Sequence, residues 1–201
     1  MGPTRPLDAV LRLEEMLGGD RDMQFEVRLS SGDSVSAEFE GSVDLRPSGE
    51  ALIDLRGELN SVVARLSSSA DGRRFLVQAQ GREVDIETPD RFRDTLAAGF
   101  VRLGLLDLLL RVLSGNPPRS ADALRREYHL EALTEVEAEP SRPDLADCLG
   151  HAYTVRNYDI EVATATLWID RFRGYPRERS QSIRPPVRLT STELYWDFQE
   201  H

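Results

Sequence analysis

Residues 92–113 read FRDTLAAGFVRLGLLDLLLRVL, and this stretch decides the fold because apolar side chains occupy most of its helical circumference. Asp107 and Arg111 stand four positions apart and can pair, so the polar stripe is narrow. A helix of this kind is either buried in a protein or spans a membrane. Three charges together with Gly99 and Gly104 interrupt the run that a span would need. We therefore predict a buried helix and not a membrane-spanning one.

The segment before this helix has the period of two that is typical of strands. From residue 35 to residue 45, apolar or small side chains alternate with acidic or small polar ones. Turn signals at Ser31-Gly32-Asp33 and Arg46-Pro47-Ser48-Gly49 separate this strand from its neighbours. The pattern predicts about six antiparallel strands over residues 24–87, preceded by an amphipathic helix over residues 5–18.

The segment after the helix returns to strands. Ser120 is placed to cap a short helix that ends near Arg126, which extends the helical region to residues 92–127. Strand-like alternation follows over residues 128–199, interrupted by a loop that begins at Glu137 and by turn signals such as Gly174-Tyr175-Pro176. We expect five further strands or so in this half.

A meander with one apolar face must close on itself, meet a second sheet or be covered by helices. The helical region 92–127 is the expected cover. The length of 201 residues fits a single domain, residues 1–201. We predict an α+β protein whose 10 to 11 antiparallel strands form a curved, incompletely closed barrel with helices plugging its open side.

Composition argues against several classes of function. A net charge of -10 opposes binding to nucleic acid, which needs a cationic surface. A single cysteine, Cys148, makes no internal disulfide, and the three histidines have no metal-ligand spacing. No cofactor or metal is expected.

Catalytic signals are equally weak. The chain contains no lysine, so neither a Schiff base nor a phosphate-binding P-loop lysine is available. No serine stands in a Gly-x-Ser-x-Gly elbow. The spacing of Cys148 and His151 suggests a thiolate pair only faintly, and a cysteine in a strand is more often a small core residue. The paired acids Glu14 and Glu15 fit a solvated helix face. We therefore do not expect an enzyme.

The last strands carry a resemblance to a known family. Residues 165–170 read ATLWID, residues 174–176 read GYP, and residues 192–198 read TELYWDF. These stretches resemble motifs of the LolA-like outer-membrane lipoprotein carriers and related envelope lipid-binding lipoproteins. The resemblance implies a half-barrel with helices over an apolar cavity. It departs from the family at Tyr175, where a leucine is usual, and no lipid-attachment cysteine stands near the start.

This resemblance implies a non-catalytic protein that binds, and transports, a lipid or the acyl chains of a lipoprotein. The alternative is an envelope protein-interaction or sensor domain on the same scaffold, with another envelope protein as partner. Residues chosen by face and size as candidates to line the cavity are Phe25, Val27, Phe39, Phe100, Leu103, Leu106, Leu110 and Trp168. The same residues would also serve as a packed core, so the sequence leaves a hollow and a filled interior open.

The location is also implied by resemblance, which points to the cell envelope or periplasm. The residues that follow Met1 form no apolar h-region, so we expect no signal peptide in the chain as written. A cytoplasmic location stays open as the alternative.

Overall fold

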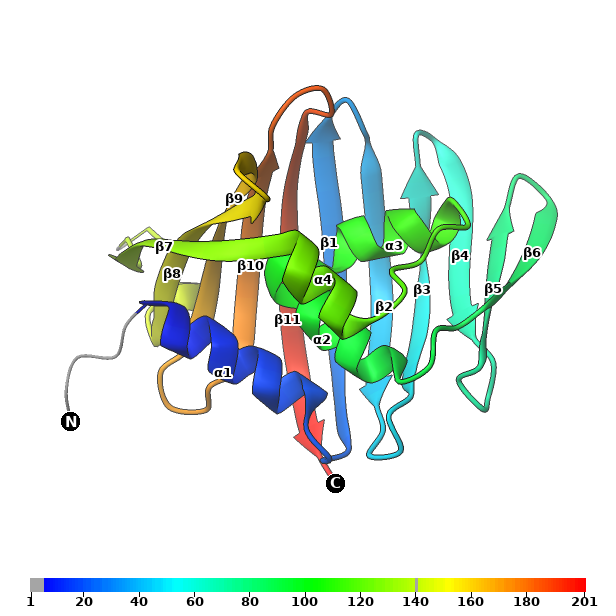
Figure 1. Ribbon diagram of the computed structural model, residues 1–201, viewed down its shortest axis with the longest axis horizontal. Coiled ribbons are helices and arrows are strands. Elements are labelled where there is room, and N and C mark those ends of the chain that lie inside the picture. The colour runs from blue at the N-terminus through cyan, green and yellow to red at the C-terminus, as the bar shows by residue number, and fades with distance from the viewer. Residues whose placement is uncertain (1–5, 140) are drawn as a thin grey trace.

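The computed structural model describes residues 6–139 and 141–201, and its main feature is one eleven-stranded antiparallel sheet (Figure 1). Its strands are β1 (Met23–Asp33), β2 (Ala37–Leu45), β3 (Ala51–Leu59), β4 (Val62–Ser68), β5 (Arg74–Ala79), β6 (Arg82–Glu87), β7 (Tyr128–Glu137), β8 (Cys148–Asn157), β9 (Ile160–Asp170), β10 (Pro176–Ile183) and β11 (Leu189–Glu200). The outer ends of these two groups of strands lie within one residue of the predicted ranges 24–87 and 128–199.

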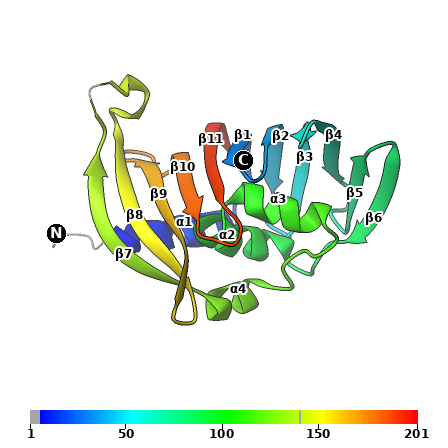
Figure 2. The same ribbon diagram turned by 90° about the horizontal axis from the view of Figure 1, so that it is seen from above.

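The sheet is curved but does not close. Its order is β6-β5-β4-β3-β2-β1-β11-β10-β9-β8-β7, so the first and last strands of the chain, β1 and β11, pair at its centre. Viewed from above, the strands form an arc whose edges β6 and β7 lie far apart (Figure 2). The predicted α+β fold with an incompletely closed antiparallel barrel is confirmed.

Two glycines permit close approach of backbones on the concave side. A Cβ added to Gly41 on β2 would lie 1.9 Å from the Asp54 carbonyl oxygen, and one added to Gly57 on β3 would lie 1.9 Å from the Glu38 carbonyl oxygen. No side chain fits at such distances. Glycine inside a strand commonly marks a bend of this kind, so these residues help the sheet to curl around the helices.

Four α-helices fill the concave side of the arc (Figure 2). They are α1 (Pro6–Gly18), α2 (Phe92–Arg102), α3 (Leu105–Leu113) and α4 (Ala121–Glu127). Helix α1 lies against β7 and β8, whereas α4 packs on α2. The expected Ser120 cap is present, because the Ser120 hydroxyl oxygen accepts from the Ala123 amide at 3.2 Å. Arg5, the first residue of the predicted N-terminal helix, lies outside the described residues.

The predicted helix over residues 92–113 is two helices. They are separated at Leu103 and Gly104, and Gly104 has φ 83° and ψ 162°, a conformation open to glycine and strained for other residues. The prediction of one continuous helix was wrong because the apolar pattern runs through the break. The predicted pair on α3 is present, with Arg111 Nε 2.8 Å from Asp107 Oδ2.

Two ion pairs that share the buried Glu14 join three of the helices. Glu14 of α1 is buried, and its carboxylate accepts from Arg102 of α2 at 2.5 Å and from Arg125 of α4 at 2.7 Å. The expectation that Glu14 lies on a solvated face was wrong, although its neighbour Glu15 is exposed.

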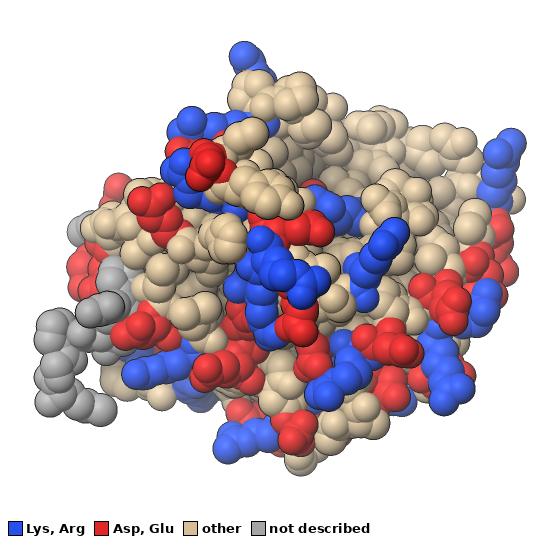
Figure 3. Space-filling model, in the orientation of Figure 1, with Lys and Arg blue, Asp and Glu red and all other residues tan. Residues whose placement is uncertain are grey.

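Charged side chains of both signs are interspersed over the lower part of the helical side, and uncharged residues predominate toward its upper right (Figure 3).

Candidate functional site

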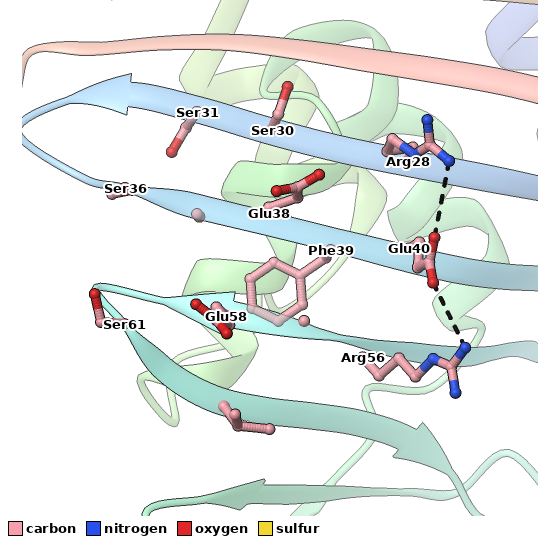
Figure 4. Close-up of a pocket in the computed structure, with 13 residues that line it drawn as sticks. Arg28, Ser30, Ser31, Ser36, Glu38, Phe39, Glu40, Arg56, Glu58 and Ser61 are labelled. Carbon is pink, nitrogen blue, oxygen red and sulfur yellow. Dashed lines mark ion pairs between the residues drawn. The ribbon is translucent and has the colours of Figure 1, made fainter.

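Several open hollows lie on the described part of the sheet, and we compare one of them with the apolar interior as a candidate binding site. One is an open groove on the face of the sheet that points away from the helices (Figure 4). It has a volume of about 660 Å³, and its lining includes Arg28, Ser30, Glu38, Glu40 and Arg56. The other is the apolar interior between α3 and the concave face of the sheet.

The groove is a solvated sheet face. Glu40 on β2 lies between Arg28 on β1 and Arg56 on β3, at 3.9 and 3.5 Å (Figure 4). All three side chains are at least half exposed, and exposed ion pairs contribute little to the stability of the fold. In the described part of the chain, no residue lining this groove has a buried polar atom without a partner. The groove therefore has no feature that demands a ligand.

The interior under α3 is apolar and filled. The remaining cavity there is about 10 Å³, roughly the space of one water molecule. Its lining comes from both sides of the interface: Val43, Ile53, Leu55 and Leu66 from the sheet, and Phe92, Leu96, Leu105, Leu108, Leu109 and Val112 from α2 and α3. A ligand larger than a water molecule enters only if these packed elements move apart.

Helix α3 is held to the sheet by a buried carboxylate. Glu193 on β11 is fully buried, and its oxygens accept from the backbone amides of Leu105 at 3.0 Å and Leu106 at 2.9 Å. These amides belong to the first turn of α3, where N–H groups have no partner within the helix and favour a negative charge. The Tyr195 hydroxyl also donates to Glu193. Burial raises the pKa of Tyr195 well above its usual value, and Glu193 raises it further, so the hydroxyl stays protonated.

Arg179 lies beside this carboxylate, since it pairs with Glu193 across β10 and β11. It is fully buried, and its Nη2 donates to Gln181 Oε1 and, at 3.4 Å, to the Arg102 carbonyl at the end of α2. Its Nε and Nη1 have no hydrogen-bond partner. Burial acts to lower the pKa of Arg179, but Tyr153 and Glu193 outweigh it and the pKa is raised. The guanidinium is therefore charged.

Gly104 provides the space for this pair. A Cβ at Gly104 would lie 2.4 Å from Arg179 Nη1 and 2.5 Å from Glu193 Oε1. The joint between α2 and α3 thus rests directly on the two buried charges. We call Arg179, Gln181, Glu193 and Tyr195 the buried polar cluster.

Most of the candidate residues lie in the core, and Trp168 does not. Phe25, Val27, Phe39, Phe100, Leu103 and Leu106 are buried, and Leu110 on α3 is half-buried. Trp168 lies on the opposite face, because its neighbours Leu167 and Ile169 belong to the core and strand side chains alternate. Its ring covers Gly150, whose added Cβ would lie 3.0 Å from it. The expectation that Trp168 faces the interior was wrong.

The buried polar cluster was missed by sequence reasoning. Strand β10 reads PRERSQSI and looks polar on both faces, so nothing in it shows that Arg179 and Gln181 face the core. In β11, Glu193 shares a face with the buried Ser191 and Tyr195, and this alternation was the available signal.

Other residues considered for chemistry do not come together. Cys148 and His151 are three residues apart on β8 and so point to opposite faces of the sheet. Burial raises the pKa of the Cys148 thiol, which opposes thiolate formation. Within residues 6–139 and 141–201, no group of three His, Cys, Asp or Glu side chains could hold a metal ion. None of the described helices has the length and apolar character to cross a bilayer.

Several solved structures are similar to this chain. A LolA superfamily protein from Nitrosomonas europaea has a TM-score of 0.34 and 10% identity, covering 98% of this chain and 94% of that one. The MucA/MucB complex of Pseudomonas aeruginosa gives 0.38 and 16%, covering 97% of this chain and 56% of that one. A putative outer membrane lipoprotein-sorting protein domain from Vibrio parahaemolyticus has a TM-score of 0.39 and 7% sequence identity. The match covers 97% of this chain and 92% of that one.

Two of these structures bear names of the family that the late-strand motifs resemble. No protein-family model matches the chain, and no curated protein matches it in sequence. Similarity at these TM-scores does not identify a ligand, which has to be inferred from the residues of the chain itself.

Proposed function

We propose that the protein is a non-catalytic binding protein for a lipid or the acyl chains of a lipoprotein, and that α3 moves to admit them. The observation that carries this proposal is the construction of α3. It is a nine-residue helix that buries Leu105, Leu106, Leu108, Leu109 and Val112. Its described polar contacts with the sheet are few: Glu193 accepts from its first turn, and Arg111 donates to the Tyr128 hydroxyl at 3.3 Å. Lifting it would expose two matching apolar surfaces.

The ends of α3 favour such a movement. Gly104 joins it to α2, and residues 114–120 join it to α4 without regular structure. A helix of this length is not stable alone in water, so α3 depends on its packing against the sheet. An acyl chain supplies equivalent apolar contacts and could replace that packing at little cost. The apolar lining of the interface suits hydrocarbon, and the motif resemblance supports an envelope location.

An interaction or sensor domain is the second candidate, and the filled interior favours it. Among the described residues, the outer edges of β6 and β7 have no strand partner, and an extended segment of another protein could pair with either edge. Leu133 on β7 is 57% exposed and would lie beside such a partner.

One pair of substitutions separates the two candidates. Leu109→Gln changes the interior, whereas Leu133→Gln makes the same chemical change at the edge. Binding is measured by displacement of the neutral dye N-phenyl-1-naphthylamine with 1-monopalmitoylglycerol. We expect Leu109→Gln to weaken binding by about tenfold or more, because it puts an amide into an apolar site, and Leu133→Gln to leave it unchanged.

Circular dichroism shows whether both variants are folded. A folded Leu109→Gln variant with undiminished affinity, or a wild-type protein that binds no acyl ligand, would refute the carrier proposal and favour the interaction domain. Mass spectrometry of denatured protein purified from cells provides an independent check, since a stoichiometric acylated species supports the carrier.

A further inference from the structure

Arg179 has more hydrogen-bond donors than the protein uses. A guanidinium carries five N–H groups, and those on Nε and Nη1 have no partner although the side chain is fully buried. Burying a donor without an acceptor costs free energy, so such groups usually have a hydrogen-bond partner. This position lies directly under the α2–α3 joint at Gly104, where a ligand admitted by α3 would enter.

Most described acceptors around Arg179 already accept other hydrogen bonds. Glu193 accepts from two backbone amides and from Tyr195. Gln181 Oε1 accepts from the other end of the guanidinium. The Tyr153 hydroxyl donates to the Val101 carbonyl at 2.6 Å, and it lies near Arg179 without a well-formed hydrogen bond to Nε or Nη1. Two nitrogens of Arg179 are thus available to an acceptor from outside the chain.

Charge decides which acceptor fits. Arg179 and Glu193 are adjacent and opposite, so together they are neutral. A carboxylate or phosphate would leave this buried region with a net negative charge beside Glu193, which is costly at low dielectric. An ester carbonyl is a hydrogen-bond acceptor without charge and keeps the region neutral.

The polar cluster also borders the apolar interior. The Tyr195 ring lies 5.0 Å from that of Phe100 and 6.2 Å from that of Phe25, centroid to centroid. A chain lying along these residues toward β2 and β3 would have its polar end at the cluster. We propose that the free N–H groups of Arg179 bind the ester carbonyl of the acyl chain, so that the site selects esters over free fatty acids. This inference rests on the proposed function and specifies its ligand.

Three ligands with the same C16 chain test it by dye displacement. They are 1-monopalmitoylglycerol, its ether analogue 1-O-hexadecylglycerol, which lacks the carbonyl, and palmitate. For the wild-type protein we expect the ester to bind about tenfold or more tightly than either of the others, because a hydrogen bond to a charged group contributes about this much.

Two variants then test the role of the charges. Glu193→Gln leaves Arg179 uncompensated, so palmitate should gain about tenfold relative to the ester. The double variant Arg179→Met with Glu193→Gln removes both charges and keeps neutrality, and its preference for ester over ether should disappear. Circular dichroism verifies folding, and the wild-type comparison needs no variant.

Three other binding results would each contradict part of this proposal. Equal binding of ester and ether by the wild-type protein would overturn the inference while leaving the acyl-binding function intact. Tightest binding of palmitate would overturn the argument from neutrality. If none of the three ligands binds, both the inference and the proposed function fail.

Discussion

Glu193 shows how much depends on a single residue, because it holds the first turn of α3 and compensates Arg179 at once. Removing one member of a buried charge pair is costly, since the other is left without compensation. We predict that Glu193→Gln lowers the free energy of unfolding by about 3 kcal/mol. Urea denaturation measures this change.

The matched control is Glu40→Gln, which also removes one carboxylate. Glu40 forms exposed ion pairs with Arg28 and Arg56. Exposed pairs contribute little, so the loss there should stay within about 1 kcal/mol. Equal effects of the two substitutions would mean that Glu193 does not anchor α3.

His151 makes a prediction about pH. It is buried with its Nδ1 3.9 Å from Glu135 Oε1, and burial lowers its pKa from 6.5 although Glu135 opposes this. The unfolded chain therefore takes up a proton at higher pH than the folded protein. As pH falls through 6.5, stability should be lost until the folded-state pKa is reached, by at most about 1.4 kcal/mol per pH unit.

The difference in unfolding free energy between wild type and His151→Gln isolates this contribution from that of other groups. It is measured by urea denaturation at intervals from pH 8 to pH 5. We expect the wild type to lose its advantage as the pH falls. A difference that is constant with pH, or that grows on acidification, would contradict the argument.

At the scale of elements, the joint between α2 and α3 depends on Gly104. An alanine there would combine strain at φ 83° with contacts of 2.4 and 2.5 Å to Arg179 and Glu193. We predict that Gly104→Ala lowers the unfolding free energy by about 3 kcal/mol or more. Gly115→Ala is the control, because Gly115 has φ 74° but nothing within 4 Å of an added Cβ.

Gly115→Ala should lower the unfolding free energy by about 1 kcal/mol, because it introduces backbone strain without a steric clash. Thermal or urea unfolding compares the two variants. If Gly104→Ala proved no worse than Gly115→Ala, the close approach of the joint to the buried polar cluster would be disproved.

The elements that sequence predicts well are those whose pattern reflects a single face. Strands β1 to β5 and the buried character of α3 follow from periodicity, because each buries one apolar side. The break at Gly104 does not follow, since its cause is the pair of charged side chains beneath it. Trp168 was misplaced because both faces of β9 are covered, one by the core and one by its packing on Gly150. Contacts between distant strands decide such cases.

At the scale of the molecule, the central strand β1 and helix α3 differ in how firmly the rest of the fold holds them. Strand β1 pairs with β2 on one side and β11 on the other, and its Phe25, Val27 and Leu29 are buried. Helix α3 has no such double support and lies between Gly104 and an irregular segment. Local opening of a protein begins where buried contacts and hydrogen bonds are fewest, which identifies α3 as an early unit to open.

Native-state hydrogen exchange tests this difference directly. We predict that amides of residues 105–113 exchange through an opening at least about 2 kcal/mol below global unfolding, with weak dependence on urea, because little surface is exposed. Residues 25–29 of β1 should exchange only through global unfolding. In Glu193→Gln, the protection of α3 should fall further than that of β1. If α3 and β1 exchanged together at every urea concentration, α3 could not move independently, and the interior would be closed to any ligand short of unfolding.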